Sequence, residues 1–206
     1  MQIPDSLPLD AAATIPDNFV TAFWSLFDQL QLTFPSTVPK NGTPVPSPPS
    51  ADTSILVYGA GATSGQYAIQ LLNLAGYKNI LVTASPKHHG HLHNIGATHT
   101  FDYSSPTLTQ DIEAAARGKV SVILDCVTAE GTLAVTSKVI SSNGTVALLL
   151  PIKRGNKLTS DVDAELAMEL ADDKSPFPHT VKVIGVQTFT YQSVSGVLCI
   201  ATMCIF

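Results

Sequence analysis

Short apolar runs alternate with amphipathic stretches along most of the chain. Six runs rich in β-branched residues have the length of buried strands, namely 55–58, 80–83, 98–101, 120–126, 145–150 and 181–186. Amphipathic segments between them predict helices over 66–75, 106–117 and 160–170. Strands buried on both faces are typical of parallel sheets covered by helices. The pattern therefore predicts an α/β fold with a doubly wound, parallel, six-stranded sheet.

Capping residues mark the ends of two of these helices. Ser105 before Pro106 predicts a helix start, and Gly118 predicts the end of the same helix. Ser160 and Asp163 resemble a capping box, which predicts a further helix through Leu170.

The pattern before the first strand is different. Residues 9–32 have apolar side chains at three- and four-residue intervals, so they predict an N-terminal helical lead-in. Six prolines between 34 and 51 predict a surface connection, because proline continues neither a helix nor a central strand. We therefore expect a lead-in with its Pro-rich connection over 1–50, an α/β domain over 51–190 and an atypical apolar tail over 191–206.

A glycine-rich loop joins the first predicted strand to the next helix. Gly59, Gly61 and Gly65 follow the strand, and Thr63 and Ser64 add hydroxyl donors. Glycine permits a sharp turn and close approach to a ligand, and a helix N-terminus offers free N–H donors to phosphate. The spacing G-x-G-x-x-x-G departs from the commonest fingerprint. Its place between strand and helix still favours a phosphate-binding turn over a purely structural one, so we expect a Rossmann-type dinucleotide-binding domain.

The end of the second predicted strand bears on the choice of cofactor. An NAD-binding domain places a carboxylate about 20 residues beyond the glycine loop, but this chain has Ser85 and Lys87 there. A hydroxyl and a positive charge suit a 2′-phosphate, so NADP(H) is favoured over NAD(H). The missing carboxylate also disfavours a methyltransferase. A short-chain dehydrogenase is disfavoured because no tyrosine begins a Y-x-x-x-K pair.

Composition and charge bear on the kind of partner and the cellular location that this protein can have. With 45% hydrophobic residues, 13% charged residues and a net charge of -5, the chain should fold but has no broad basic surface for nucleic acid. Three cysteines and an N-terminus without a secretory signal favour a reducing, cytoplasmic location. The tail is too short and polar to span a membrane. Histidines between 88 and 93 are interpreted as an exposed helix face, so no metal site is predicted.

Several sequence blocks together resemble the medium-chain dehydrogenases/reductases, in particular the zinc-independent quinone oxidoreductases and enoyl reductases such as fungal trans-acting enoyl reductases. The similarity covers residues 3–190 and rests on the blocks IPDSLPLDAAATIP with FVTAFWSLFDQL, ILVYGAGATSGQYAIQLLNLAGY, TASPKHHGHLHNIGATHTFDYSSP and VSVILDCV. Two departures are Ser64, where many members have valine, and the run of histidines after Lys87.

The resemblance implies a set of site residues. Thr21 would lie near the nicotinamide and is the catalytic candidate. Thr63, Ser64 and Gly65 would face the pyrophosphate. The whole implied cofactor-binding set is Gly59, Gly61, Ala62, Thr63, Ser64, Gly65, Ser85, Lys87, Tyr103 and Val127, in which Ser85, Lys87 and Tyr103 surround the adenosine phosphate and Val127 lines the cleft.

The resemblance also implies a reaction, namely hydride transfer from NADPH to an activated double bond or carbonyl of a small-molecule substrate. The chain starts after the GroES-like barrel that such enzymes carry, so we expect a fragment, and no proton donor can be assigned. The alternative is a truncated, non-catalytic nucleotide-binding protein that keeps only the Rossmann pocket. A polyketide-synthase-type partner is implied by the resemblance alone.

Overall fold

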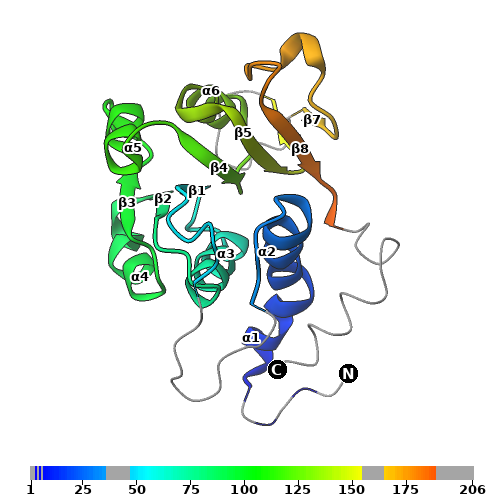
Figure 1. The fold of residues 1–206 in the computed structure, drawn as a ribbon. Helices are drawn as coiled ribbons and strands as arrows, with labels where there is room; N and C mark the ends of the chain where they lie inside the picture. Colours follow the sequence, from blue (N-terminus) through cyan, green and yellow to red (C-terminus); the bar gives the residue numbers. More distant parts are fainter. Residues whose placement is uncertain (1–2, 4, 6, 36–46, 155–164, 189–206) are drawn as a thin grey trace.

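The computed structural model describes residues 3, 5, 7–35, 47–154 and 165–188. Six parallel strands form one sheet in the order β3-β2-β1-β4-β5-β8 (Figure 1). They are β1 (Ile55–Tyr58), β2 (Ile80–Ala84), β3 (His99–Asp102), β4 (Val120–Asp125), β5 (Ile140–Leu149) and β8 (Lys182–Val186). The strand order reverses between β1 and β4, as in a doubly wound Rossmann sheet. The predicted fold class is thus confirmed.

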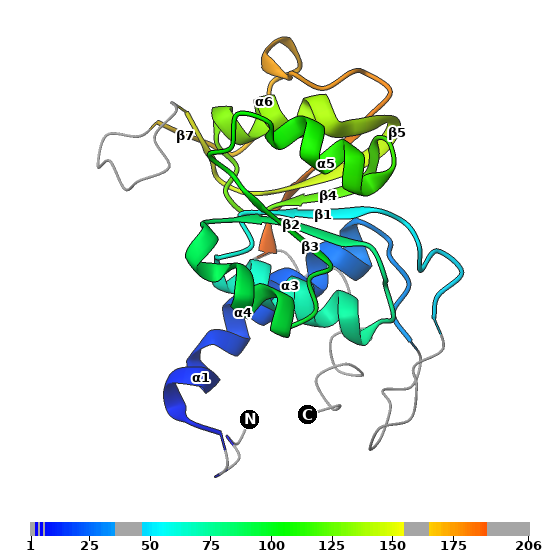
Figure 2. The same cartoon turned by 90° about the vertical axis from the view of Figure 1, so that its left-hand side faces the viewer.

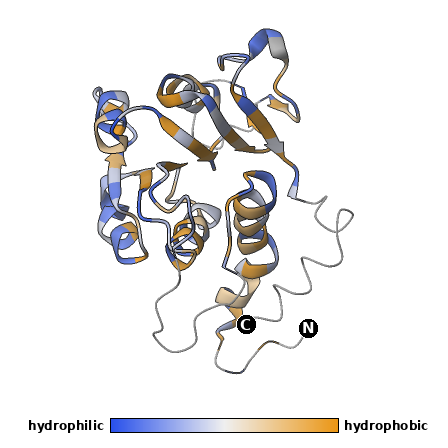
Figure 3. Cartoon of the chain, in the orientation of Figure 1, coloured by the Kyte–Doolittle hydropathy of each residue, from blue (hydrophilic) through white to orange (hydrophobic). Residues whose placement is uncertain are grey.

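Helices cover both faces of this sheet (Figure 2). One face carries α3 (Thr63–Leu74) and α4 (His89–Asn94), and the other carries α5 (Leu108–Ala116) and α6 (Glu130–Val139). Alternate residues of β1 divide between the two layers, since Ile55 and Val57 pack in one cluster and Leu56 packs in the other. The apolar strands in Figure 3 are therefore enclosed on both sides.

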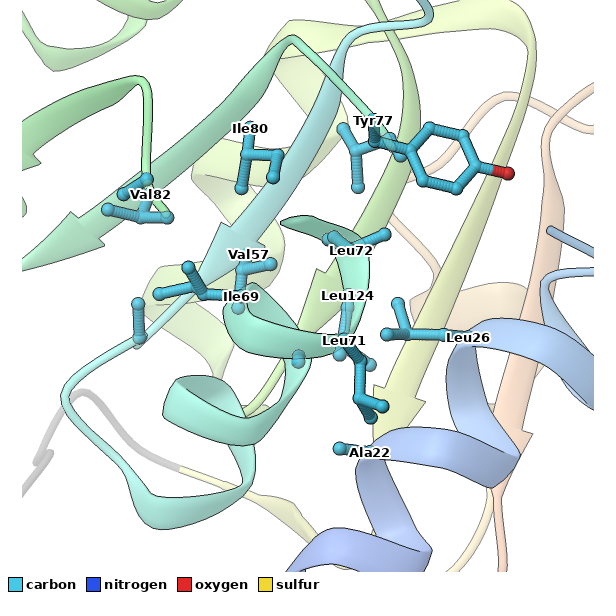
Figure 4. Packing of buried hydrophobic residues seen from close by; sticks show 14 of the residues in the cluster. Ala22, Leu26, Val57, Ile69, Leu71, Leu72, Tyr77, Ile80, Val82 and Leu124 are labelled. Carbon is cyan, nitrogen blue, oxygen red and sulfur yellow. The ribbon is translucent and has the colours of Figure 1, made fainter. Parts of the chain in front are cut away.

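The predicted lead-in helix is continuous from residue 9 to residue 29. It consists of α1 (Leu9–Thr14), a π-helical turn (Ile15–Phe19), α2 (Val20–Phe23) and a second π-helical turn (Trp24–Gln29). It ends before Gln31, which has a left-handed φ of 54°. Figure 4 shows Ala22 and Leu26 of this helix against Leu71 of α3, so the lead-in completes the core on that face.

Some sequence-based boundaries were wrong. Helix α5 begins at Leu108 with Thr107 at the N-cap, two residues beyond the predicted first turn, because Ser105 closes a turn with the Leu108 N–H. The helix ends at Ala116, and its C-cap is Arg117 with a left-handed φ of 57°, whereas the sequence predicted the end at Gly118. Helix α6 was not predicted.

The predicted helix through Leu170 was also wrong where it can be compared. Its capping residues lie outside the described part of the chain, but Leu166–Ala167 forms a short strand, β7. This strand pairs antiparallel with β6 (Ile152–Lys153), and a 3-10 turn (Asp172–Lys174) follows. The core of the Pro-rich connection (36–46) and the tail 191–206 lie outside the described residues. Among the described residues, no helix is long and apolar enough to cross a membrane.

Candidate functional site

Two loop glycines are required by the protein's own packing. Gly59 has a φ of +76°, and a Cβ there would lie 2.3 Å from Val127 Cγ2. Its N–H donates to the Thr83 hydroxyl over 3.0 Å, which fixes the turn on β2. A Cβ on Gly65 would lie 2.8 Å from Ala60 Cα, so glycine lets α3 approach the end of β1. These contacts hold the glycine loop at the carboxyl ends of β1 and β4, where the strand order reverses.

Gly61 is different, because the protein's own packing does not demand it. A Cβ there would touch only His88, at an ordinary 3.5 Å from its Cδ2 atom. The N–H groups of Thr63, Ser64 and Gly65 stand in the first turn of α3, where they have no partner within the helix. The loop backbone at Gly61, which only the His88 ring approaches, and the free N–H groups beside it form a cradle that fits a phosphate.

The residues expected at the adenosine phosphate lie at the ends of β2 and β3. The Ser85 hydroxyl donates to the Tyr103 hydroxyl over 3.4 Å, and Lys87 is exposed in the 3-10 turn Pro86–His88. The nearby Asp102 carboxylate accepts hydrogen bonds from the Ser104 N–H (2.9 Å) and hydroxyl (2.7 Å), which lower its pKa. These bonds hold Asp102 ionised within its own loop.

Thr21 lies at the opposite end of the site. It is 8% exposed, and its hydroxyl donates to the Thr188 hydroxyl over 3.1 Å. Both line a cleft of about 380 Å³ beside the end of β8, where the blue lead-in helix approaches that strand in Figure 1. The cleft is lined by Pro16, Asp17, Thr21, Ser64, Leu149, Leu150, Val186, Gln187 and Thr188.

A larger cavity of about 520 Å³ lies between the β5 and β8 strands and the segment 168–179. None of the residues predicted for the site lines it. It adjoins the first cleft at Leu150 and Gln187, which line both. The predicted residues thus lie along the carboxyl edge of the sheet in three groups: the adenosine end, the glycine loop with Val127, and the cleft of Thr21 and Ser64. Ligands of open α/β sheets bind at this edge, near the reversal of strand order.

A buried carboxylate that the sequence analysis missed fixes the loop carrying Val127. Asp125 ends β4 with no exposed surface, and its Oδ1 atom accepts the N–H groups of Val127 and Thr128, both at 2.9 Å. Its Oδ2 atom accepts the Thr132 hydroxyl at 2.5 Å. Burial raises the pKa of the Asp125 carboxyl, and these hydrogen bonds oppose the rise. The network also holds Thr128 at a left-handed φ of 51°.

Three other polar residues at the loop were not predicted as site residues. The Ser64 hydroxyl donates to Asn18 Oδ1 over 3.0 Å, and the Gln66 side-chain amide donates to the Gly61 carbonyl over 3.0 Å. The His88 ring flanks Gly61. The only sequence signal for Asn18 was its place in the lead-in helix, because its partner Ser64 is 46 residues away.

The histidines of α4 are held by neighbouring groups. His89 Nε2 contacts the Ala84 carbonyl at 3.1 Å, and His93 Nδ1 contacts the Ala97 carbonyl at 2.9 Å. In the part of the chain that the structure describes, no group of three or more His, Cys, Asp or Glu side chains could hold a metal ion. Burial raises the pKa of the Cys126 thiol, as in a small apolar residue rather than a nucleophile.

Comparison with known proteins points to one kind of relative. Residues 65–160 match a family model described as "Zinc-binding dehydrogenase". The trans-enoyl reductase iliB of Neonectria sp. is 34% identical over 69% of this chain and 37% of its own length. The dual trans-enoyl reductase/FAD-dependent monooxygenase tazHJ of Aspergillus terreus is 31% identical over 82% of this chain and 22% of its own length. The chain thus spans little more than a third of these relatives at most.

Solved structures show the same fold at lower identity. The CurK enoyl reductase aligns with a TM-score of 0.71 and 19% identity over 98% of this chain and 52% of that one. A quinone oxidoreductase of Pseudomonas syringae aligns with a TM-score of 0.66 and 19% identity over 94% of this chain and 51% of that one.

Proposed function

This chain belongs to the medium-chain dehydrogenase/reductase superfamily, and we propose that it forms the NADP(H)-binding part of an oxidoreductase of the enoyl or quinone reductase type. The observation that carries the proposal is Gly61, where a Cβ would meet only the His88 ring at van der Waals distance, beside the free N–H groups of α3. Packing within the turn explains why Gly59 and Gly65 are glycines, but it does not explain why residue 61 is a glycine. Close approach of a diphosphate supplies that reason.

In this proposal, different groups of residues bind different parts of the cofactor. The first-turn N–H groups of α3 hold the diphosphate, and Ser85, Lys87 and Tyr103 hold the adenosine phosphate. The nicotinamide end lies in the cleft of Thr21, whose hydroxyl is oriented by Thr188. The cofactor supplies the hydride when bound. The substrate class is a small molecule with an activated carbon–carbon double bond or a carbonyl, as the names of the enoyl and quinone reductase relatives suggest.

Replacing Gly61 with alanine tests the cradle. The Cβ meets no clash in the protein, so we expect the free energy of unfolding to stay within about 1 kcal/mol of the wild type. The same Cβ occupies the surface that the diphosphate approaches, so NADPH affinity should fall at least about tenfold. Gly90→Ala is the matched control, because it adds the same methyl group at a position where a Cβ meets nothing within 4 Å. Unchanged NADPH binding by Gly61→Ala, followed by nicotinamide fluorescence, contradicts the proposal.

The preference for NADP(H) is tested by the double substitution Ser85→Ala with Lys87→Ala. Each hydrogen bond to a charged phosphate is worth about 1.5–3 kcal/mol, so NADPH affinity should fall by about tenfold or more while NADH affinity changes little. Lys78→Ala is the control, because it removes one exposed positive charge just before the amino end of β2. Equal losses for NADPH and NADH would show that these residues do not read the 2′-phosphate.

A further inference from the structure

Asn18 links the lead-in helix to the first turn of α3. It lies in the π-helical turn Ile15–Phe19, and its Oδ1 atom accepts the Ser64 hydroxyl at 3.0 Å. π-Helical turns inside longer helices are frequent at functional sites. The neighbouring residues Pro16 and Asp17 line the 380 Å³ cleft together with Ser64. Asn18 therefore lies where the cleft meets the glycine loop.

Within the described residues, the side-chain amide nitrogen of Asn18 keeps two N–H donors without a partner. Ser64 is the one hydrogen-bond partner of the Asn18 side chain among the described residues. No buried side-chain nitrogen or oxygen in the described part of the chain lacks a partner, so the Asn18 amide nitrogen is reached by solvent. Because the amide group is planar, anchoring Oδ1 on Ser64 also fixes the direction of these two donors.

The charges around the cleft favour an amide over a carboxylate at position 18. Asp17 is the one charged residue among those that line the cleft, and it already places a carboxylate beside Asn18. A second carboxylate would repel a diphosphate at the N-terminus of α3, whereas an amide offers N–H donors to its oxygens. The side chain of Asn18 is thus suited to contact an anionic ligand held by the glycine loop.

We propose that Asn18 is a cofactor-contacting residue, which Ser64 orients so that the Asn18 amide nitrogen donates to the diphosphate side of the dinucleotide. This inference rests on the proposed function, since it assigns a further contact within the same site. It also gives Ser64 a definite role in this chain, because its hydroxyl proton is committed to Asn18 while its backbone N–H remains free for the phosphate.

The test compares three variants of the full chain by titration with NADPH and by thermal unfolding. Asn18→Asp keeps the acceptor for the Ser64 hydroxyl but replaces the N–H donors with negative charge. We expect it to unfold within a few degrees of the wild type and to bind NADPH at least about tenfold more weakly, with a smaller loss at high salt. Asn18→Ala lacks the donors without adding charge, so its affinity should fall by about fivefold.

Thr14→Val is the matched control. It removes the 2.6 Å hydrogen bond between the Thr14 hydroxyl and the Tyr67 hydroxyl, which joins the same lead-in helix to α3 but involves no cleft residue. Its NADPH affinity should stay within about twofold of the wild type. Wild-type affinity in Asn18→Asp overturns the inference, and so does a loss in Thr14→Val as large as that in Asn18→Asp. A wild-type chain that binds neither NADPH nor NADH overturns the proposed function itself and this inference with it.

Discussion

Replacing Asp125 with alanine is expected to lower the free energy of unfolding by about 2–5 kcal/mol. The substitution leaves the N–H groups of Val127 and Thr128 without their acceptor, and each unsatisfied buried donor costs about 1–3 kcal/mol. It also releases Thr128 from the bonds that hold its left-handed backbone. Urea unfolding followed by circular dichroism measures the loss.

Two further variants separate the role of Asp125 from a general effect of removing a carboxylate. Asp125→Asn keeps an oxygen that can accept both N–H groups, so it should lose about half as much stability as Asp125→Ala. Asp111→Ala removes an exposed carboxylate that, among the described residues, accepts a side-chain bond from the Thr107 hydroxyl alone, and should change stability by no more than about 0.5 kcal/mol. If Asp125→Ala were as stable as Asp111→Ala, the buried network would not hold the loop.

The strands were readable from the sequence because both of their faces are buried. β1 matched its predicted range residue for residue, since its four apolar positions are all buried and Gly59 ends the run. β5 begins at Ile140, five residues before its predicted start. Its first half includes Ser142 and Asn143, which are exposed, so the apolar pattern does not extend to it.

The helix errors have a different origin. The capping signal at Ser160 is local, whereas the structure of Leu166–Ala167 is decided by pairing with β6, which ends at Lys153, before the predicted capping residues. The Arg154 side chain bonds Glu165 Oε1 at 2.5 Å, and the Arg154 N–H bonds the Glu165 carbonyl at 2.9 Å, so this segment is drawn into a hairpin. Tertiary pairing here outweighs helix propensity.

The candidate site was readable where its residues are close in sequence. The glycine loop and the Ser85–Lys87 turn each lie within a few residues, so their spacing carried information. Asn18, Asp125 and Thr188 entered the site only through folding, because Asn18 meets Ser64, and Thr188 meets Thr21, across long separations in the chain. The spacing of residues along the sequence cannot show such long-range contacts, because they depend on the order of the strands in the sheet.

Replacing Gly59 with alanine is expected to cost about 2–5 kcal/mol of stability and to weaken NADPH binding. A left-handed backbone costs a non-glycine residue about 1–2 kcal/mol, and forcing Val127 away from a Cβ at 2.3 Å adds a packing cost of about 1–3 kcal/mol. The two terms separate in a double-mutant cycle with Val127→Ala, which removes the clashing Cγ2 atom. Measured by urea unfolding, Gly59→Ala should then cost only about 1–2 kcal/mol, the backbone term alone.

The cycle also shows whether the loop after β4 is rigid. Because Asp125 fixes the Val127 backbone, Val127 has little freedom to retreat from a new Cβ on Gly59, and the coupling between the two sites should be large. An equal cost of Gly59→Ala in both backgrounds would mean that the loop moves aside freely. In that case the hydrogen bonds of Asp125 would not hold Val127 against the glycine loop. The loss of NADPH binding in Gly59→Ala would then come from the changed backbone of the turn alone.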